Sequence, residues 1–141
     1  TPLKLKKQLF LQKNTASGIV IEPITSATKL NLGDKIKVRI ELRVDRDMSY
    51  VHMKDMRASG FEPTNVFSGY RYQDGLGYYE STRDAATNFF FSYLNKGTYV
   101  FEYPLVVNHY GDFSNGITTI QCMYAPEFTS HSEGIRVKVV K

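Results

Sequence analysis

The sequence predicts an all-β fold, an antiparallel β-sandwich of about eight strands. Several segments alternate apolar and polar residues with the period of strands that bury one face, most clearly at residues 35–45. Turn signals containing glycine separate these segments, and no stretch has the periodicity of a useful amphipathic helix. With 141 residues, the chain is expected to form one domain over residues 1–141.

Four strands are predicted in the first part of the chain. Residues 2–13 are expected to begin as an edge strand, and Pro23 limits the pairing of a short strand at 18–24. The strand at 35–45 alternates charged residues with five apolar ones, which are Ile36, Val38, Ile40, Leu42 and Val44. After a turn, residues 50–56 resume the alternation, and we expect them to form a hairpin with residues 35–45.

Three more strands are predicted in the second part. Residues 88–94 indicate a buried strand, followed by a tight turn. Residues 98–108 indicate a long aromatic strand, in which Pro104 predicts a bulge or a locally unpaired edge. Residues 135–140 again alternate.

Residues 57–86 between these parts are rich in glycine and aromatic residues. Within them, residues 70–79 are expected to form a hairpin that turns at Asp74–Gly75. Four tyrosines mark a possible contact surface for carbohydrate or protein: Tyr70, Tyr72, Tyr78 and Tyr79. The other interpretation is a surface loop held down by its own aromatic side chains.

The stretch Gly116–Phe128 begins as a strand and then loses its alternation. Thr118, Ile120 and Cys122 are predicted to face one way, with their neighbours facing the other. Met123 and Tyr124 then follow each other directly, before Ala125 and Pro126, and proline cannot donate to a β-ladder. The two large side chains therefore either close the core at a sheet end or present a contact surface.

Composition and charge argue against several classes of function. The net charge of +4 divides into +6 over residues 1–57 and −2 over residues 58–141. Because the cations alternate with apolar residues, they indicate the solvated face of a strand, and no nucleic-acid partner is expected. No run of 18 apolar residues exists, so no membrane insertion is expected. The start at Thr1, without methionine or signal peptide, suggests a mature product or an excised piece.

No catalytic or metal constellation is apparent in the sequence. Cys122 is the single cysteine, which leaves no internal disulfide. No acidic residues cluster near it and histidine occurs only at positions 52, 109 and 131, so neither a zinc site nor a Cys–His pair is suggested. The acidic residues are scattered singly, which argues against the paired carboxylates of a glycosidase. We therefore expect neither an enzyme nor a cofactor.

The second half of the chain carries a series of short motifs. They are Asp84, Phe89-Phe90-Phe91, Leu94, Gly97-Thr98-Tyr99, Glu102-Tyr103, Gly111-Asp112-Phe113 and Met123-Tyr124-Ala125-Pro126-Glu127-Phe128. Upstream stand Arg46-Asp47, Asp55-Met56 and Gly60-Phe61-Glu62. From Lys35 to Val140 the chain resembles the C-terminal macroglobulin-like domain of bacterial alpha-2-macroglobulins, an immunoglobulin- or fibronectin-like sandwich. The family's proline before the Gly60 segment is missing, and the insertion at Tyr70–Tyr79 resembles the form in Bacteroides-type bacteria.

The resemblance implies a piece of a large protease trap in the periplasm or cell envelope, often lipid-anchored. In such proteins a protease cuts a bait region, and thioester-containing members capture it through a Cys–Gln thioester in another domain. The last domain carries a locking loop that shields the thioester. The matching positions here are Met123, Tyr124, Ala125, Pro126 and Glu127, with Pro126 holding the loop and Glu127 anchoring it.

The partners implied are the other domains of the same parent chain, the thioester domain above all, and the target proteases. This chain has no Cys-x-x-Gln segment of its own, since Cys122 is followed by Met-Tyr-Ala, so it is expected to be non-catalytic. The alternative is a free-standing carbohydrate- or protein-binding module that uses the aromatic loop at Tyr70–Tyr79.

Overall fold

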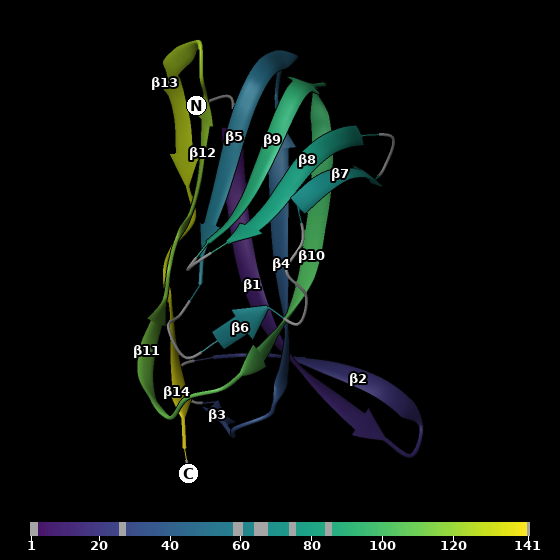
Figure 1. Ribbon diagram of the computed structural model, residues 1–141, viewed down its shortest axis with the longest axis vertical. Helices are drawn as coiled ribbons and strands as arrows, with labels where there is room; N and C mark the ends of the chain where they lie inside the picture. Colours follow the sequence, from purple (N-terminus) through teal and green to yellow (C-terminus); the bar gives the residue numbers. More distant parts are fainter. Residues whose placement is uncertain are drawn as a thin grey trace.

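The computed structural model describes residues 3–25, 28–57, 61–63, 68–73, 76–83 and 86–140, which form fourteen strands in three sheets (Figure 1). The five-stranded sheet has the order β2 (Gly18–Pro23), β1 (Leu3–Thr15), β4 (Lys35–Val44), β10 (Gly97–Val107), β6 (Phe61–Pro63). The six-stranded sheet has the order β13 (Ala125–His131), β12 (Thr118–Cys122), β5 (Met48–Met56), β9 (Ala86–Leu94), β8 (Leu76–Arg83), β7 (Ser68–Gln73). The small sheet has the order β11 (Gly111–Asn115), β14 (Ile135–Val139), β3 (Lys29–Leu30).

The two large sheets form a sandwich around one hydrophobic core. Figure 1 shows β5, β9 and β8 lying across β1, β4 and β10. Between the sheets, the Phe101 ring lies 5.4 Å from Tyr78, 5.5 Å from Phe89 and 5.7 Å from Phe91, measured between centroids. All four side chains are buried. Burying a side chain of this size contributes about 1.5–3 kcal/mol, so these rings are a main source of the sandwich's stability.

The predicted all-β antiparallel sandwich is confirmed. The side chains of β4 that alternate toward the core are the five predicted ones, and all are buried. The structure has more strands than the eight or so predicted. Of the additional strands, β3 and β6 are only two and three residues long, too short to show a measurable periodicity. The other two are β11 and β13, which are five and seven residues long and were not predicted as strands. One further difference is that β3 pairs with β14 in parallel, while the other pairs are antiparallel.

The predicted hairpin between residues 35–45 and 50–56 is wrong. The strand β4 lies in the five-stranded sheet, whereas β5 lies in the six-stranded sheet between β12 and β9. Each strand has one apolar face, and these faces meet in the same core cluster. The chain at residues 45–47 therefore crosses from one layer to the other, which buries both faces more completely than a hairpin would.

Most of the other local predictions agree with the structure. The aromatic segment forms the hairpin β7–β8, in which Gln73 pairs with Leu76, although residues 74–75 at its turn lie outside the described residues. Pro104 pairs in unbroken register with β4, so the predicted bulge is not formed against that strand. On the other side, the described pairing with β6 covers Leu105 to Val107, and the residues that follow β6 lie outside the described part of the chain. The start of β1 is an edge, as expected, since β2 joins it from Phe10 onward.

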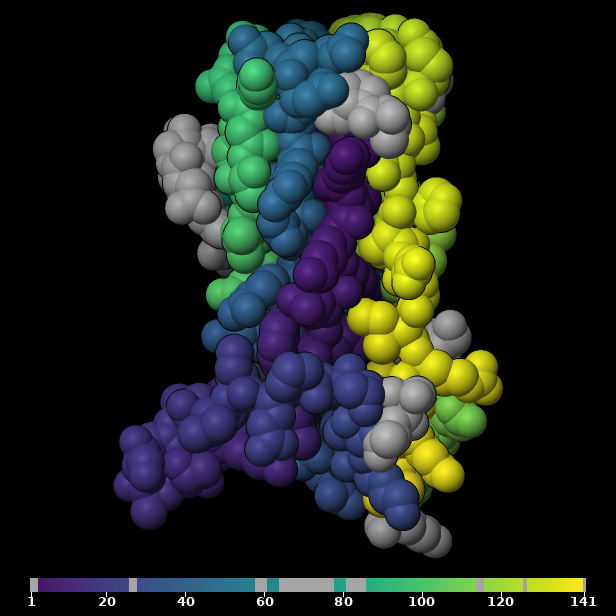
Figure 2. Space-filling model, turned by 180° about the vertical axis from the view of Figure 1, so that it is seen from behind, coloured from purple at the N-terminus to yellow at the C-terminus, as the bar shows by residue number. Residues whose placement is uncertain are grey.

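The molecule is elongated, and one ribbon projects from it. Figure 2 shows β1, β4 and β10 side by side on the outer face of the five-stranded sheet, with the β1–β2 ribbon projecting at the lower end. On this ribbon, Ile19 is 67% exposed. Among the described residues, no helix has the length and apolar character that crossing a membrane requires.

Candidate interdomain contact surface

Met123 and Tyr124 connect β12 to β13 at one end of the sandwich. Within β12 the predicted alternation is confirmed, since Thr118, Ile120 and Cys122 are buried. The next two side chains are not: Met123 is 58% exposed and Tyr124 is 78% exposed. The interpretation in which they close the core is therefore excluded, and they stand as exposed apolar groups at the tip of the β12–β13 hairpin (Figure 1).

The hairpin is irregular directly after this tip. Gln121 pairs with Thr129, but Cys122 pairs with Ala125, so residues 126–128 are accommodated on β13 alone. A bulge of this kind suits Pro126, which has no N–H for the ladder. Glu127 is exposed, and the half-buried Phe128 ring has its centroid 5.3 Å from the Arg46 guanidinium carbon above it. The bulge therefore gives the predicted loop residues a shape that differs from a regular strand.

Tyr50 joins the two tip residues from the neighbouring strand β5. Its carbonyl oxygen accepts a hydrogen bond of 2.9 Å from the Met123 backbone N–H. Its ring meets the Tyr124 ring edge to face, with centroids 5.0 Å apart and an interplanar angle of 82°. Tyr50 is itself 51% exposed. We call Tyr50, Met123 and Tyr124 together the apolar tip.

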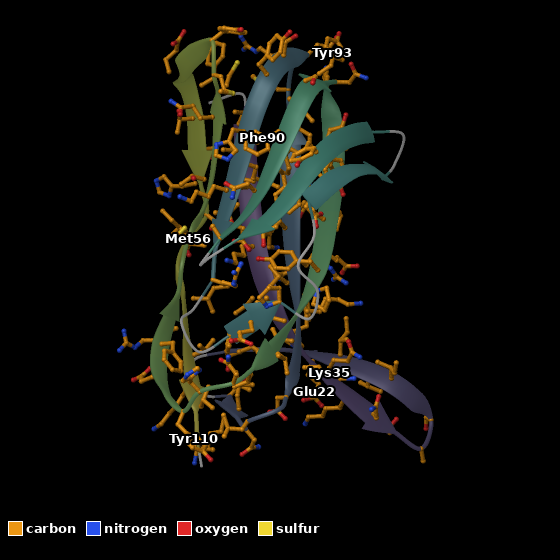
Figure 3. All side chains as sticks on the ribbon, in the orientation of Figure 1. Glu22, Lys35, Met56, Phe90, Tyr93 and Tyr110 are labelled. Carbon is orange, nitrogen blue, oxygen red and sulfur yellow. The ribbon has the colours of Figure 1, made fainter. Side chains whose placement is uncertain are left out.

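Tyr93 exposes a further aromatic ring at the same end of the molecule. It is 53% exposed, near the end of β9, and its hydroxyl donates a 3.4 Å hydrogen bond to Asp47 Oδ2 (Figure 3). Asp47 Oδ1 also accepts a 2.7 Å hydrogen bond from the backbone N–H of Lys96. Asp47 thus ties the connection between β4 and β5 to the turn between β9 and β10 at this end of the molecule.

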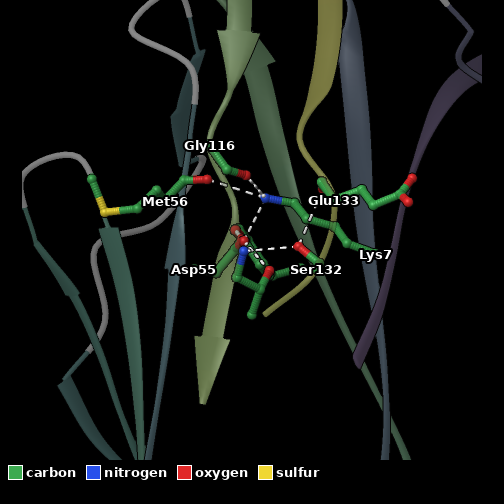
Figure 4. Close-up of polar contacts among 8 residues, drawn as sticks. Lys7, Asp55, Met56, Gly116, Ser132 and Glu133 are labelled. Carbon is green, nitrogen blue, oxygen red and sulfur yellow. Dashed lines mark hydrogen bonds and ion pairs between the residues drawn. The ribbon is translucent and has the colours of Figure 1, made fainter. Parts of the chain in front are cut away.

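A buried polar cluster lies at the other end of β5 and β12 (Figure 4). The Lys7 ammonium contacts Asp55 Oδ1, and the side chains of both residues are 0% exposed. Lys7 Nζ also donates to the carbonyl oxygens of Met56 at 3.1 Å and Gly116 at 3.0 Å. These bonds join β1 of the five-stranded sheet to β5 of the six-stranded sheet. They also join β1 to Gly116, which lies just before β12.

Two hydroxyl groups complete the coordination of the Asp55 carboxylate. Thr118 Oγ1 donates a 2.7 Å hydrogen bond to Oδ1, and the Tyr103 hydroxyl donates to Oδ2. Burial raises the pKa of Asp55, and the Lys7 charge and the Lys7 and Thr118 hydrogen bonds oppose this effect. Burial likewise lowers the pKa of Lys7, opposed by Asp55. Because the cluster is closed to solvent and satisfied within the protein, it holds the sheets together and offers no reaction site.

The aromatic surface that the sequence suggests is mostly not formed by the described side chains. Tyr78 is 4% exposed and packs on the core phenylalanines, so its assignment to a contact surface is wrong. Tyr79 is half-buried with its ring 6.2 Å from Phe90. The side chains of Tyr70 and Tyr72 lie outside the described part of the chain, although their backbone belongs to β7.

The rings beside Tyr79 are also turned toward each other. His52 and Phe90 stack face to face, with centroids 4.6 Å apart and an interplanar angle of 9°. His52 Nε2 is 2.9 Å from Asn88 Oδ1. The two rings thus cover one face of each other, while Phe90 remains 39% exposed. Among the described residues, no group of three His, Cys, Asp or Glu side chains could hold a metal ion.

Sequence reasoning found the two hairpin residues of the tip but missed Tyr50, Lys7 and Asp55. Tyr50 gave no signal, because its contact with Tyr124 depends on the pairing of β5 with β12. The buried pair did give one. Lys7 alternates in phase with Leu9 and Leu11, and Asp55 shares its strand face with Val51 and Met53. A single charge of each sign on an apolar strand face indicates a buried ion pair.

The fold and this surface define a macroglobulin-like β-sandwich domain with an exposed apolar hairpin tip. The family comparison gives the same class: the sequence model of the bacterial alpha-2-macroglobulin MG10 domain matches residues 3–127. The chain therefore belongs to the bacterial alpha-2-macroglobulin MG10 domain family.

Solved structures of alpha-2-macroglobulins have the same fold. The Salmonella protein reacted with methylamine superimposes with a TM-score of 0.76 and 15% identity, covering 100% of this chain and 9% of that chain. The Escherichia coli protein activated by porcine elastase gives a TM-score of 0.77 and 11% identity, covering 100% of this chain and 13% of that chain. A curated Dictyostelium discoideum protein, circularly permutated Ras protein 2, is 21% identical over 128 residues, 91% of this chain and 3% of that protein. The chain thus spans a small fraction of each of these relatives.

Proposed function

We propose that this chain is one non-catalytic domain of a longer bacterial protease trap of the alpha-2-macroglobulin type. The longer protein is called the parent below. In this proposal the residues from Met123 to Glu127 form a locking loop that packs against the thioester domain of the parent. The observation that carries the proposal is the exposure of Met123 and Tyr124, 58% and 78%, at the tip of an otherwise well-buried strand.

The physical argument starts from the cost of this exposure. Large apolar side chains in water forgo roughly 1.5–3 kcal/mol each relative to burial, so such a tip is favoured where a partner covers it. A thioester is hydrolysed when water reaches it. A methionine and a tyrosine packed over it would keep water and small amines away until the domains move apart.

Family membership supports the same assignment. One relative of the same fold was activated by a protease, porcine elastase, and another was reacted with methylamine, a small amine. We further propose that the parent acts in the periplasm or cell envelope, anchored by lipid at its N-terminus, with proteases as its targets. Fractionation of cells that express the parent tests this location, and recovery in the cytosol would contradict it.

The test of the locking role uses the parent carrying Met123→Ala or Tyr124→Ala. Both changes should speed the incorporation of labelled methylamine, because each opens a path for the amine to the thioester. Ile19→Ala is the matched control, since Ile19 is also an exposed apolar residue, 67% exposed, but lies on the distant β1–β2 ribbon. Unchanged methylamine rates in both tip variants would contradict the proposal, as would a parent that fails to slow a protease after bait cleavage.

A further inference from the structure

Tyr50 has a backbone conformation that is unfavourable for its residue type. Its φ is 55°, in the left-handed region. Among the described residues, Tyr50 is the one residue other than glycine that has a positive φ. A bulky aromatic residue is a genuine outlier there, because its Cβ approaches the following carbonyl. Such strain persists where surrounding contacts over-determine the conformation, and it concentrates at functional sites.

The contacts that hold Tyr50 are those of the apolar tip. From Val51 onward, β5 pairs regularly with β12, Val51 opposite Cys122. At Tyr50 the strand departs from this geometry, yet its carbonyl reaches the Met123 N–H at 2.9 Å and its ring meets Tyr124 at 5.0 Å. Both contacts go to the tip residues, and neither goes to the core.

We propose that Tyr50 is a positioning residue of the locking loop and the third member of its contact surface. This inference rests on the proposed function and deepens it. The Tyr50 carbonyl fixes where Met123 leaves β12, and the Tyr50 ring supports the edge of the Tyr124 ring. The partner surface that this arrangement fits is an apolar, water-excluding depression around the thioester, wide enough for two tyrosines and a methionine from two different strands.

The decisive variant is Tyr50→Gly in the parent. Glycine adopts a positive φ without strain, which offsets its greater freedom in the unfolded chain, so the melting temperature should stay close to that of the unmodified parent. At the same time the ring contact to Tyr124 is lost, and methylamine should enter faster by up to about tenfold, the factor that corresponds to one aromatic pair. Replacing a merely structural residue would instead lower the melting temperature and would leave the rate of methylamine entry unchanged.

Two further variants complete the experiment. Tyr50→Phe keeps the ring and should leave the methylamine rate at the parent's value. Tyr50→Gly combined with Tyr124→Ala should speed methylamine entry by less than the product of the two single increases, because part of the Tyr50 effect is exerted through the Tyr124 ring.

The outcomes separate the two proposals. If Tyr124→Ala speeds methylamine entry and Tyr50→Gly does not, the positioning role is overturned and the locking function stands. If neither variant changes the rate, the locking function itself fails. A clear fall in melting temperature for Tyr50→Gly would mark Tyr50 as a structural residue and would also overturn the inference.

Discussion

The strands β5 and β12 carry two regions of opposite character at their two ends. At one end, Asp55 and Thr118 join the buried polar cluster around Lys7. At the other end, Tyr50 and Met123 belong to the exposed apolar tip. Charged side chains, which are usually exposed, are buried at the first end. Large apolar side chains, which are usually buried, are exposed at the second end.

The buried cluster serves the stability of the fold, whereas the exposed tip is available for contact with another domain. Every strong donor of the cluster has an acceptor inside the chain, so the cluster can contribute to the cohesion of the sheets without any partner. The tip makes few contacts of its own and leaves its apolar area open. Mutations in the cluster should therefore affect folding, and mutations in the tip should affect interaction.

The largest effect is expected for Asp55→Ala, which leaves the Lys7 ammonium buried without a counter-charge. Removing one partner of a buried pair costs about 3–5 kcal/mol in the free energy of unfolding. Urea denaturation of the 141-residue chain measures this loss. The double variant Lys7→Met/Asp55→Leu is the control and should regain most of the stability, because apolar side chains can replace a buried pair. A double variant as unstable as the single one would contradict the ion-pair account.

Thr118→Val should have the next largest effect. The change keeps the shape of the side chain but removes the 2.7 Å hydrogen bond to the Asp55 carboxylate. Hydrogen bonds to charged groups are worth about 1.5–3 kcal/mol. The adjacent Thr119→Val is a matched control, because Thr119 is half-buried on the other face of β12, and it should stay within about 0.5 kcal/mol. Equal losses in the two variants would show that the cluster bond is unimportant.

The free energy of unfolding should depend on pH in the directions set by the pKa shifts of Asp55 and Lys7. The pKa of Asp55 is raised by burial above 3.8, so the folded state holds this proton more tightly than the unfolded state. Stability relative to the double variant should fall as the pH rises above 3.8, the ordinary pKa of an aspartate side chain. Lys7, whose pKa is lowered from 10.5, acts in the opposite sense, so stability should recover as the pH rises toward 10.5. Urea titrations across pH measure both changes, and a rise in stability above pH 3.8 would show that the ion pair outweighs burial.

The smallest effect on stability is expected for Tyr124→Ala. Because the side chain is 78% exposed, the free energy of unfolding should change by no more than about 0.5 kcal/mol. Ile120→Ala, four residues before Tyr124 in the same hairpin and fully buried, should cost about 2–5 kcal/mol in the same assay. A loss of several kcal/mol for Tyr124→Ala would mean that the tip belongs to the core after all.

Predictions from the sequence were most accurate where the burial pattern depends on a single strand. The alternation of residues 35–44 and 118–122 gave the buried faces correctly, and the break at Met123–Tyr124 located the tip. Prediction was weaker where two distant strands had to meet. The crossing between β4 and β5 looks like a hairpin turn in sequence, and the φ of Tyr50 has no sequence signature. Tyr78 resembled its exposed neighbours until the pairing of β8 with β9 turned its ring to the core.

The most direct test of the contact role compares methionine oxidation in the 141-residue chain and in the uncleaved parent. Hydrogen peroxide converts accessible methionine to its sulfoxide, and peptide mass spectrometry gives the rate at each site. Met123 is 58% exposed, whereas Met53 and Met48 are 0% and 6% exposed and serve as internal controls. We predict that Met123 oxidises rapidly in the 141-residue chain, several-fold more slowly in the uncleaved parent, and rapidly again after bait cleavage. Equal Met123 rates in all three samples would contradict the account, because no other domain would then cover the tip.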